Sequence, residues 1–370
     1  MAHVIKLLIT GGHVTGALAV IDELLKTGKS KSIVFVGRKY VNDNEKGLSF
    51  EYQEVTARNI HFIHLETGRL TWILSFSIFV QFFKVINGLI KSYKILSNEK
   101  PVVILSFGGY IALPVAIIGK LLGIKIVTHE QTIEPGTANR IIGRIAKKIC
   151  ISFPETSPFF DKNKVVLTGN PVRLSIFKPQ KKLLFSKNRP CIYVTGGSIG
   201  SHAINVHVEN ILKELLKKYT VIHQCGNISE FGDFERLESL RNSLSQELKN
   251  HYIFKEHFLD SEIADVYDLS DLVVSRSGAN TFFELVALSK PALFIPLPWS
   301  ARSEQQKHAQ IFKNHGAGEI FFQDEPSAKL LEIIDEMFLK IDKYRLNLKK
   351  LAHYYKPHAQ RTIIQLLFEE

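Results

Sequence analysis

One short pattern occurs twice in this chain and limits the folds that it can adopt. Residues 7–25 read LLITGGHVTGALAVIDELL, and residues 192–212 read IYVTGGSIGSHAINVHVENIL. In both, an apolar run meets Thr-Gly-Gly, then a polar residue, and then a helical pattern. Such a corner joins a buried strand to a helix whose N-terminus offers free N–H groups to a phosphate. Two copies predict two domains that each open with a βα corner. Neither copy is a complete G-x-G-x-x-G, so each alone could equally be a structural turn.

Strand candidates alternate with helical patterns along the whole chain. Continuous apolar strands separated by helices indicate parallel sheets that are covered on both faces. The polar, proline-containing stretch 168–190 divides the candidates into two groups. We therefore predict two doubly wound, Rossmann-like α/β domains, at residues 1–170 and 171–352, which suits a length of 370 residues. The candidate strands are residues 4–9, 32–36, 102–106, 125–128, 149–152 and 165–167, then 191–195, 220–224, 252–256, 272–275 and 292–295.

The charge balance favours anionic partners. The chain has 47 Lys and Arg against 36 Asp and Glu, a formal net charge of +11. The basic residues are scattered and form no nucleic-acid-binding motif, so we expect no nucleic acid but a phosphorylated substrate or an anionic membrane surface. The cysteines, Cys150, Cys191 and Cys225, lack metal or redox spacing. Cys150 and Cys191 sit beside apolar, strand-like residues, so we expect buried free thiols and a reducing cytoplasm. The N-terminal segment lacks the pattern of a signal peptide.

Polar groups gather after one predicted strand of the second domain. Residues 275–299 read SRSGANTFFELVALSKPALFIPLPW. Ser277 and Gly278 are expected to place backbone donors at the start of a helix that begins near Ala279. Glu284 falls in the first turns of that helix. Its carboxylate could accept both ribose hydroxyls of a nucleotide, or it could be a solvated helix residue.

A sugar diphosphate needs hydroxyl contacts and a cation. Gln305 and Gln306 carry the amide donors and acceptors that suit sugar hydroxyls, although a Gln pair on a helix is also common on ordinary surfaces. The chain has no D-x-D motif to hold a metal against a diphosphate, so we expect no metal in the site. Helix N-termini and a cation would then stabilise the leaving diphosphate, and Arg173, in GNPVR at the domain junction, is the candidate.

Two titratable groups of the first domain are candidates for a general base. His13 ends the first glycine turn, and His129 and Glu130 directly follow a predicted strand. Glycosyl transfer needs one base near the acceptor hydroxyl, a role open to His13 or Glu130. A histidine in a turn is also frequently structural, so the sequence leaves this choice open.

An aromatic stretch at residues 69–96 is the strongest candidate for membrane contact. Its apolar runs are too short for a membrane-spanning helix, which needs about 20 apolar residues. Lys84 and Lys91 interrupt it. An interfacial segment would bury the aromatic rings in lipid and leave the cations at the headgroups; the alternative is that all of the rings are core. The residues expected to contact the membrane are Trp72, Phe76, Phe79 and Phe83.

Seven segments, taken in chain order, resemble the MurG family of peptidoglycan N-acetylglucosaminyltransferases. They are TGGHVTGALAVIDEL, SFGGYIALP, THEQTIEPGTANRIIGRIAKKI, TGNPVR, VTGGSIGSHAIN, SRSGANTFFELVALSKPALFIPLP and EQQ. The resemblance implies a GT-B fold with residues 353–370 packing back onto the first domain. It implies inverting transfer of GlcNAc from UDP-GlcNAc to the C4 hydroxyl of MurNAc in lipid I, giving lipid II and UDP. It also implies no organic cofactor and a peripheral enzyme on the cytoplasmic face of the plasma membrane, with other cell-wall synthesis enzymes as partners.

The resemblance also assigns site residues by position. In the second domain Arg173 and Ser198 would contact the diphosphate, and Leu259 would flank the uracil. The nucleotide would lie along Ser277, Gly278, Ala279, Asn280, Thr281 and Glu284, and GlcNAc against Gln305, Gln306 and Thr132. Thr10, Gly11 and Gly12 would close over the donor. The residues that would face the acceptor are His13, Tyr110, His129, Glu130 and Asn139.

The chain departs from the family pattern at two points. Its first loop reads TGGH where the family has GGTGGH, and Thr132 stands where the family has Asn. A hydroxyl can replace one of an amide's hydrogen bonds but not two.

Two other functions remain open from the sequence. A UDP-GlcNAc 2-epimerase would need no membrane segment, and a non-catalytic sugar-nucleotide-binding membrane partner would bind UDP-GlcNAc without releasing UDP.

Overall fold

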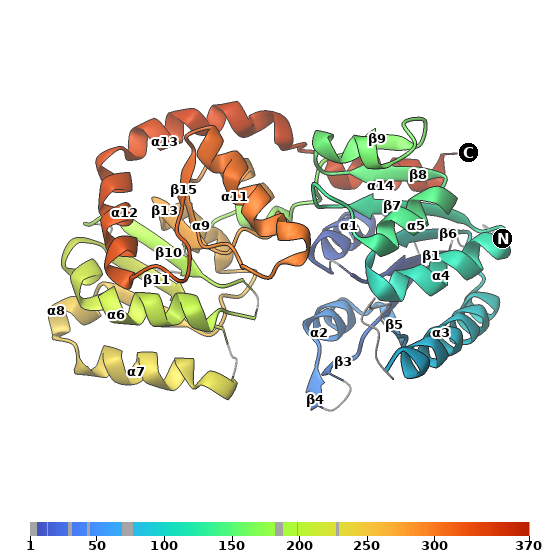
Figure 1. The fold of residues 1–370 in the computed structure, drawn as a ribbon, viewed down its shortest axis with the longest axis horizontal. Coiled ribbons are helices and arrows are strands. Elements are labelled where there is room, and N and C mark those ends of the chain that lie inside the picture. Colours follow the sequence, from blue (N-terminus) through green and yellow to red (C-terminus); the bar gives the residue numbers. More distant parts are fainter. Residues whose placement is uncertain are drawn as a thin grey trace. The chain divides into compact units, whose positions relative to one another are not determined.

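Two parallel sheets organise the chain in the computed structural model (Figure 1). The structure describes residues 6–12, 14–28, 32–42, 45–68, 77–181, 188–197, 199–226 and 229–369. The chain divides into two compact units. Unit 1 comprises Met1–Arg173 and Lys356–Glu370, and unit 2 comprises Leu174–Tyr355. The α/β fold class expected from the alternating strands and helices is confirmed.

The sheet of unit 1 has the strand order β5-β2-β1-β6-β7-β8-β9, with all neighbours parallel. Its strands are β1 (Lys6–Thr10), β2 (Ser32–Gly37), β5 (His61–His64), β6 (Val103–Ser106), β7 (Lys125–Glu130), β8 (Lys148–Ile151) and β9 (Val165–Leu167). The helices are α1 (Val14–Thr27), α2 (Phe50–Ala57), α3 (Ser77–Glu99), α4 (Gly109–Leu121), α5 (Thr137–Ile145) and α14 (Ala359–Phe368). A hairpin of β3 (Tyr40–Asn42) and β4 (Glu45–Leu48) follows β2.

The apolar side chains of this sheet supply two cores, one on each face. Leu7 and Ile9 of β1 belong to the core that includes α1, α2 and α14. Leu8, between them, belongs to the core that includes α3, α4 and α5. Successive strand residues point to opposite faces, so a strand that is apolar throughout requires helices on both sides.

The last helix of the chain belongs to the first unit. Ile363 and Ile364 of α14 are buried in the same core as α1. The Arg361 Nε lies 2.6 Å from the buried Glu23 carboxylate of α1. The chain therefore leaves unit 1 near Arg173 and returns to it near Lys356.

The sheet of unit 2 has the strand order β12-β11-β10-β13-β14-β15, again parallel throughout. Its strands are β10 (Cys191–Thr195), β11 (Thr220–Gln224), β12 (Tyr252–Lys255), β13 (Leu272–Ser275), β14 (Ala292–Phe294) and β15 (Gly318–Ile320). The helices are α6 (His202–Lys218), α7 (Asp233–Ser243), α8 (Gln246–Lys249), α9 (Ile263–Leu269), α10 (Ala279–Leu288), α11 (Glu304–Asn314), α12 (Ser327–Leu339) and α13 (Ile341–Asn347).

Helices cover both faces of this second sheet as well. One core joins the sheet to α6 and α12. On the other side, Phe282 of α10 packs edge-on against Phe312 of α11, and Phe312 packs against Phe294 of β14. In each unit the carboxyl ends of the parallel strands share one edge of the sheet, where ligands bind in open α/β folds.

Candidate functional site

Two glycine turns of unit 1 meet at the carboxyl edge of its sheet. One follows β1 and contains Gly12, and the other follows β6 and contains Gly108 and Gly109. A Cβ on Gly12 would lie 2.3 Å from the Gly108 carbonyl oxygen, and a Cβ on Gly109 would lie 3.2 Å from the Gly12 Cα. All three glycines have positive φ angles. Only glycine allows backbones to approach this closely in that conformation, so both turns depend on it.

Glu130, at the end of β7, lies inside a buried network of hydrogen bonds. Its Oε1 accepts from the Thr132 N–H at 2.9 Å and from the Thr132 hydroxyl at 2.8 Å. Its Oε2 accepts from the Asn139 side-chain amide at 2.8 Å. The Glu130 side chain is 2% exposed. The carboxylate therefore fixes the turn after β7 to the start of α5.

His129 and Asn139 are equally enclosed. His129 is buried, and its Nε2 lies 3.3 Å from the Gly169 carbonyl oxygen and 3.2 Å from the Ser152 hydroxyl. The Asn139 amide nitrogen also lies 3.3 Å from the His129 carbonyl oxygen. The structure thus brings together His129, Glu130, Thr132 and Asn139. Glu130 is hydrogen-bonded to Thr132 and Asn139, and Asn139 is hydrogen-bonded to the His129 carbonyl group.

The other expected residues of unit 1 vary in how well they are described. Thr10 ends β1 and is fully buried, and Gly11 donates its N–H to the Val36 carbonyl at 3.0 Å. Tyr110 is half-buried at the start of α4, with the Arg38 guanidinium carbon 5.8 Å from its ring centre. Arg173 is half-buried at the end of the unit's first segment. Outside the described residues lie His13, Ser198, Trp72 and Phe76, and the side chain of Phe79 is not described either.

The start of α10 forms the corresponding edge of unit 2. Ser277 is buried and donates its hydroxyl to the Gln305 carbonyl at 2.7 Å. The Ser277 carbonyl accepts from His308 Nδ1 at 3.0 Å, and burial lowers the pKa of His308 to about 4, so this histidine is neutral. Gly278 caps α10, and a Cβ there would meet no atom of the described residues within 4 Å. The Ser277 side chain thus fastens α11, while the helix N-terminus at Gly278 stays open.

The other residues of unit 2 that the resemblance assigns to the donor differ in burial and in their contacts. Glu284 is buried, and its Oε2 accepts from the Tyr267 hydroxyl at 2.7 Å. Gln305 Oε1 accepts from the Leu297 N–H at 3.1 Å, and Gln306 is exposed. Leu259 follows β12 and is 66% exposed, which is unusual for a leucine. Among the residues half-buried or buried on α10 are Ala279, Asn280 and Thr281.

Arg276 is a candidate functional residue that the sequence analysis missed. Its guanidinium donates to the Ile295 carbonyl at 2.9 Å, the Ser201 hydroxyl at 2.8 Å and the Gln323 side-chain oxygen at 2.9 Å, which are all neutral. Burial lowers its pKa to about 10, so it remains charged at neutral pH. Ser201 is the N-cap of α6, and a cation beside a helix N-terminus favours an anion. The signal in the sequence was the SRSG motif itself, where the arginine stands between the two serines.

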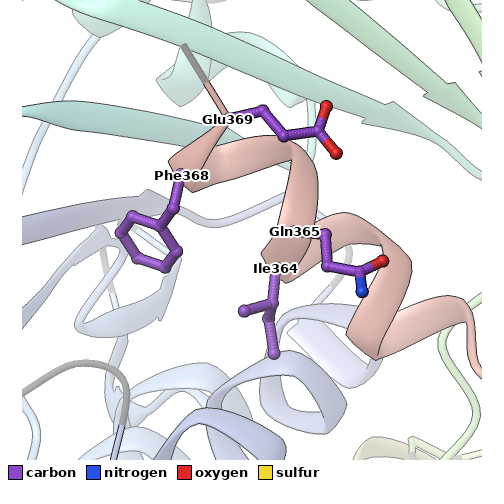
Figure 2. A pocket seen from close by; sticks show the side chains of 4 residues that line it. All are labelled: Ile364, Gln365, Phe368 and Glu369. Atoms are coloured by element: carbon purple, nitrogen blue, oxygen red, sulfur yellow. The ribbon is translucent and has the colours of Figure 1, made fainter.

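Metal-ligating side chains do not gather at these edges in the part of the chain that the structure describes. No group of three or more His, Cys, Asp or Glu side chains among the described residues could hold a metal ion. A hollow of about 530 Å³ lies on α14. Figure 2 shows the four side chains that line it, which are Ile364, Gln365, Phe368 and Glu369. All four belong to one helix, and Ile364 is part of the unit 1 core. This hollow contains none of the expected site residues.

Comparisons with known proteins agree with this architecture. The glycosyltransferase family 28 N-terminal domain matches residues 10–151, and the C-terminal domain of that family matches residues 191–365. The crystal structure of Acinetobacter baumannii MurG superposes with a TM-score of 0.71 at 22% identity, covering 98% of this chain and 99% of that one. The UDP-GlcNAc 2-epimerase from Neisseria meningitidis bound to UDP-GlcNAc gives 0.66 at 14% identity, covering 99% and 100%. The expected GT-B fold, that of a glycosyltransferase built from two Rossmann-like domains, is confirmed.

Closer relatives define the family more narrowly. A protein of Clostridium perfringens (strain 13 / Type A) is 34% identical over 94% of both chains, and one of Bacillus cereus (strain ATCC 14579) is 31% identical over 98% of this chain and 99% of its own. Both are named UDP-N-acetylglucosamine--N-acetylmuramyl-(pentapeptide) pyrophosphoryl-undecaprenol N-acetylglucosamine transferase, the second with the suffix 2. This chain belongs to glycosyltransferase family 28 and, within it, to the MurG family.

Proposed function

We propose that this protein transfers GlcNAc from UDP-GlcNAc to the C4 hydroxyl of MurNAc in lipid I, giving lipid II and UDP. The observation that carries the proposal is the 34% identity to a transferase of that name over 94% of both chains. An alignment of that extent includes both Rossmann-like domains, so the donor and acceptor halves have counterparts in the same relative.

Unit 2 is the donor side in this proposal. The open N-terminus of α10 at Gly278 and the N-terminus of α6 beside Arg276 are suited to the diphosphate. Glu284 would accept the ribose hydroxyls, Leu259 would flank the uracil, and Gln305 with Gln306 would hold GlcNAc. Replacing Arg276 with Met should weaken UDP binding about tenfold or more and weaken uridine binding far less, because in this proposal the lost charge acts on the phosphates. Calorimetric titration with both ligands tests this.

Unit 1 is the acceptor side, and His13 is the proposed base. In one inverting step the C4 oxygen attacks C1 of GlcNAc as the bond from C1 to the diphosphate breaks. The hydroxyl proton passes to the base, and UDP leaves with the electron pair of the broken bond. Glu130 is less suited to take that proton, because both of its oxygens already accept hydrogen bonds from Thr132 and Asn139. We assign Glu130 a positioning role.

A stripe of exposed apolar residues on α3 supports the proposed membrane contact. Phe83, Ile86, Ile90 and Tyr93 recur at intervals of three and four residues, so they share one face of the helix. Their exposed fractions are 66%, 37%, 52% and 53%. Lys84, Lys91 and Lys94 lie on the same helix, where they would meet anionic headgroups. Within the described ranges, no helix is long and apolar enough to span a membrane.

Release of UDP from UDP-GlcNAc, with and without a lipid I analogue in detergent, tests the proposed reaction. Release that depends on the acceptor supports the transferase, and the loss of turnover in His13→Ala supports the proposed base. Formation of UDP-ManNAc without any acceptor would instead identify a 2-epimerase. Binding of UDP-GlcNAc without release of UDP under any condition would identify a non-catalytic partner.

A further inference from the structure

A carboxyl group with one buried oxygen lies beside the first glycine turn of unit 1. Glu51 belongs to the first turn of α2, and its side chain fills a slot between Gly11 and Gly37. A Cβ on Gly11 would lie 1.8 Å from Glu51 Oε1, and a Cβ on Gly37 would lie 1.9 Å from it. Gly11 directly follows β1 and Gly37 ends β2. The carboxyl group therefore occupies the space that two missing side chains leave at neighbouring strand ends.

The environment of this carboxyl group favours its neutral form. Oε1 is buried and has no hydrogen-bond partner among the described residues. The backbone N–H of Arg38 donates to the carboxyl group, and the Arg38 guanidinium attracts it. Burial outweighs both effects and raises the pKa of Glu51 from 4.5 to about 7. A carboxylate oxygen without a donor is costly to bury, whereas the protonated acid leaves no charge unpaired.

Several titratable groups on the elements packed against α2 have partners other than Glu51. Asp22 of α1 and Glu54 of α2 both pair with Arg58, at 2.7 and 2.8 Å. His64 of β5 accepts from the Lys39 N–H at 3.1 Å and lies 3.6 Å from Glu66. The Lys39 ammonium lies 5.1 Å from the ring centre of Tyr52. Arg38 is the charged group that acts on Glu51.

The position of Glu51 links its charge to the turn that it covers. The Gly11–Gly12 turn touches the Gly108 turn on one side through Gly12, and the Glu51 carboxyl group packs against Gly11. The turn leads into α1, whose N-terminus favours a bound anion. A negative charge in the slot would oppose that anion in a medium of low dielectric constant. The lipid acceptor of the proposed reaction carries such a group, a diphosphate.

We infer that Glu51 is a positioning residue of the acceptor site: its neutral carboxyl group sets the first glycine turn for an anionic acceptor, and its ionisation weakens acceptor binding. The inference rests on the proposed function, because it takes the diphosphate-bearing acceptor as the ligand of unit 1. Glu51 itself touches the turn and not the reacting atoms.

The test compares the pH dependence of the acceptor KM in three proteins. In the wild type this KM should rise about tenfold from pH 6 to pH 8, because the protonated fraction of a group with a pKa of about 7 falls from about nine-tenths to about one-tenth. In Glu51→Gln, which keeps the shape and stays neutral, it should stay level at the low value. Glu54→Gln is the matched control on the same helix, since Glu54 pairs with Arg58, and should retain the rise. The same rise in Glu51→Gln as in the wild type would overturn the inference.

A second measurement separates this inference from the proposed function. In protein labelled with 15N-glycine, the amide resonances of Gly11 and Gly37 should shift with a midpoint near pH 7 and should lose that shift in Glu51→Gln. The shift requires no substrate. If the glycine resonances shift but UDP release does not depend on the acceptor at any pH, the result counts against the proposed function alone. Acceptor-dependent release with glycine resonances that do not respond to Glu51 would count against the inference alone.

Discussion

Replacing Glu130 with Gln distinguishes a residue that positions the turn after β7 from a residue that takes the acceptor proton. The amide nitrogen of Gln must face either Thr132, which donates twice to this side chain, or Asn139, which donates once. The less damaging orientation opposes the Asn139 amide and loses one hydrogen bond to a charged group. Such a bond contributes about 1.5 to 3 kcal/mol, and the two opposed donors add to the loss.

The effect should appear first at the Thr132 amide. Loss of about 1.5 to 3 kcal/mol of local stability speeds hydrogen exchange about ten- to a hundredfold when exchange follows local opening. Turnover should fall by less than the hundred- to ten-thousandfold loss that removal of a general base causes. Adding Asn139→Asp should restore part of both properties, since an Asp at 139 accepts from the Gln amide. Hydrogen exchange and steady-state kinetics on the single and double variants supply the comparison.

The opposite pattern would refute this reasoning. If Glu130→Gln abolished turnover, left the exchange of the Thr132 amide unchanged and gained nothing from Asn139→Asp, Glu130 would act on the reacting proton. The base would then be a buried carboxylate, and His13 would lose its proposed role.

Three further predictions follow from single features of the structure. Glu51 binds its proton more tightly in the folded protein, so the stability that it contributes is complete below pH 4.5 and is lost as the pH rises to about 7. Over that window the free energy of unfolding of the wild type should fall by about 3 kcal/mol relative to that of Glu51→Gln. Urea unfolding at several pH values measures this difference. Gly12→Ala should lower the melting temperature and the turnover sharply, because its Cβ would lie 2.3 Å from a backbone oxygen, whereas Gly28→Ala, at φ +63° with open space around it, should cost only about 1 to 2 kcal/mol. Phe83→Ser should weaken binding to anionic vesicles, measured by co-sedimentation, about tenfold or more, because burying a phenylalanine contributes about 1.5 to 3 kcal/mol. Leu339→Ser on α12 of unit 2, where the leucine is 85% exposed, should leave vesicle binding unchanged.

The strands that sequence patterns located are those with continuous apolar runs. All eleven candidates overlap a strand of the structure, and the elements that were missed carry weaker signals. β5 reads His-Phe-Ile-His at the edge of its sheet, and β15 is the three residues Gly-Glu-Ile at the edge of the other. A short edge strand has one paired side and few buried residues, so its pattern does not differ from that of a loop.

The sequence motifs located the candidate site, but they indicated the roles of its residues only in part. The Thr-Gly-Gly corners and the SRSG and HEQ segments identified the carboxyl edges of both sheets, because motif and strand end are adjacent in the chain. The hydrogen bonds from Thr132 and Asn139 to Glu130 depend on how the turn after β7 folds back, and the spacing of residues in the sequence does not predict that. Glu51 lies in a helix that reads as polar and solvated. Its carboxyl oxygen Oε1 is buried because two glycines, 26 positions apart in the sequence, stand where neighbouring strands end: Gly11 just after β1, and Gly37 as the last residue of β2.

The return of α14 to unit 1 has a consequence for how the chain is made. Arg361 meets Glu23 across 338 positions of sequence, and Ile363 lies in the core that α1 covers. A ribosome releases residues in order, so the whole of unit 2 emerges before the helix that covers this face of unit 1. During synthesis the apolar surface that α14 covers on unit 1 therefore stays exposed until unit 2 has been synthesised. A chain that stops short of α14 would leave that surface as a site for chaperones and aggregation.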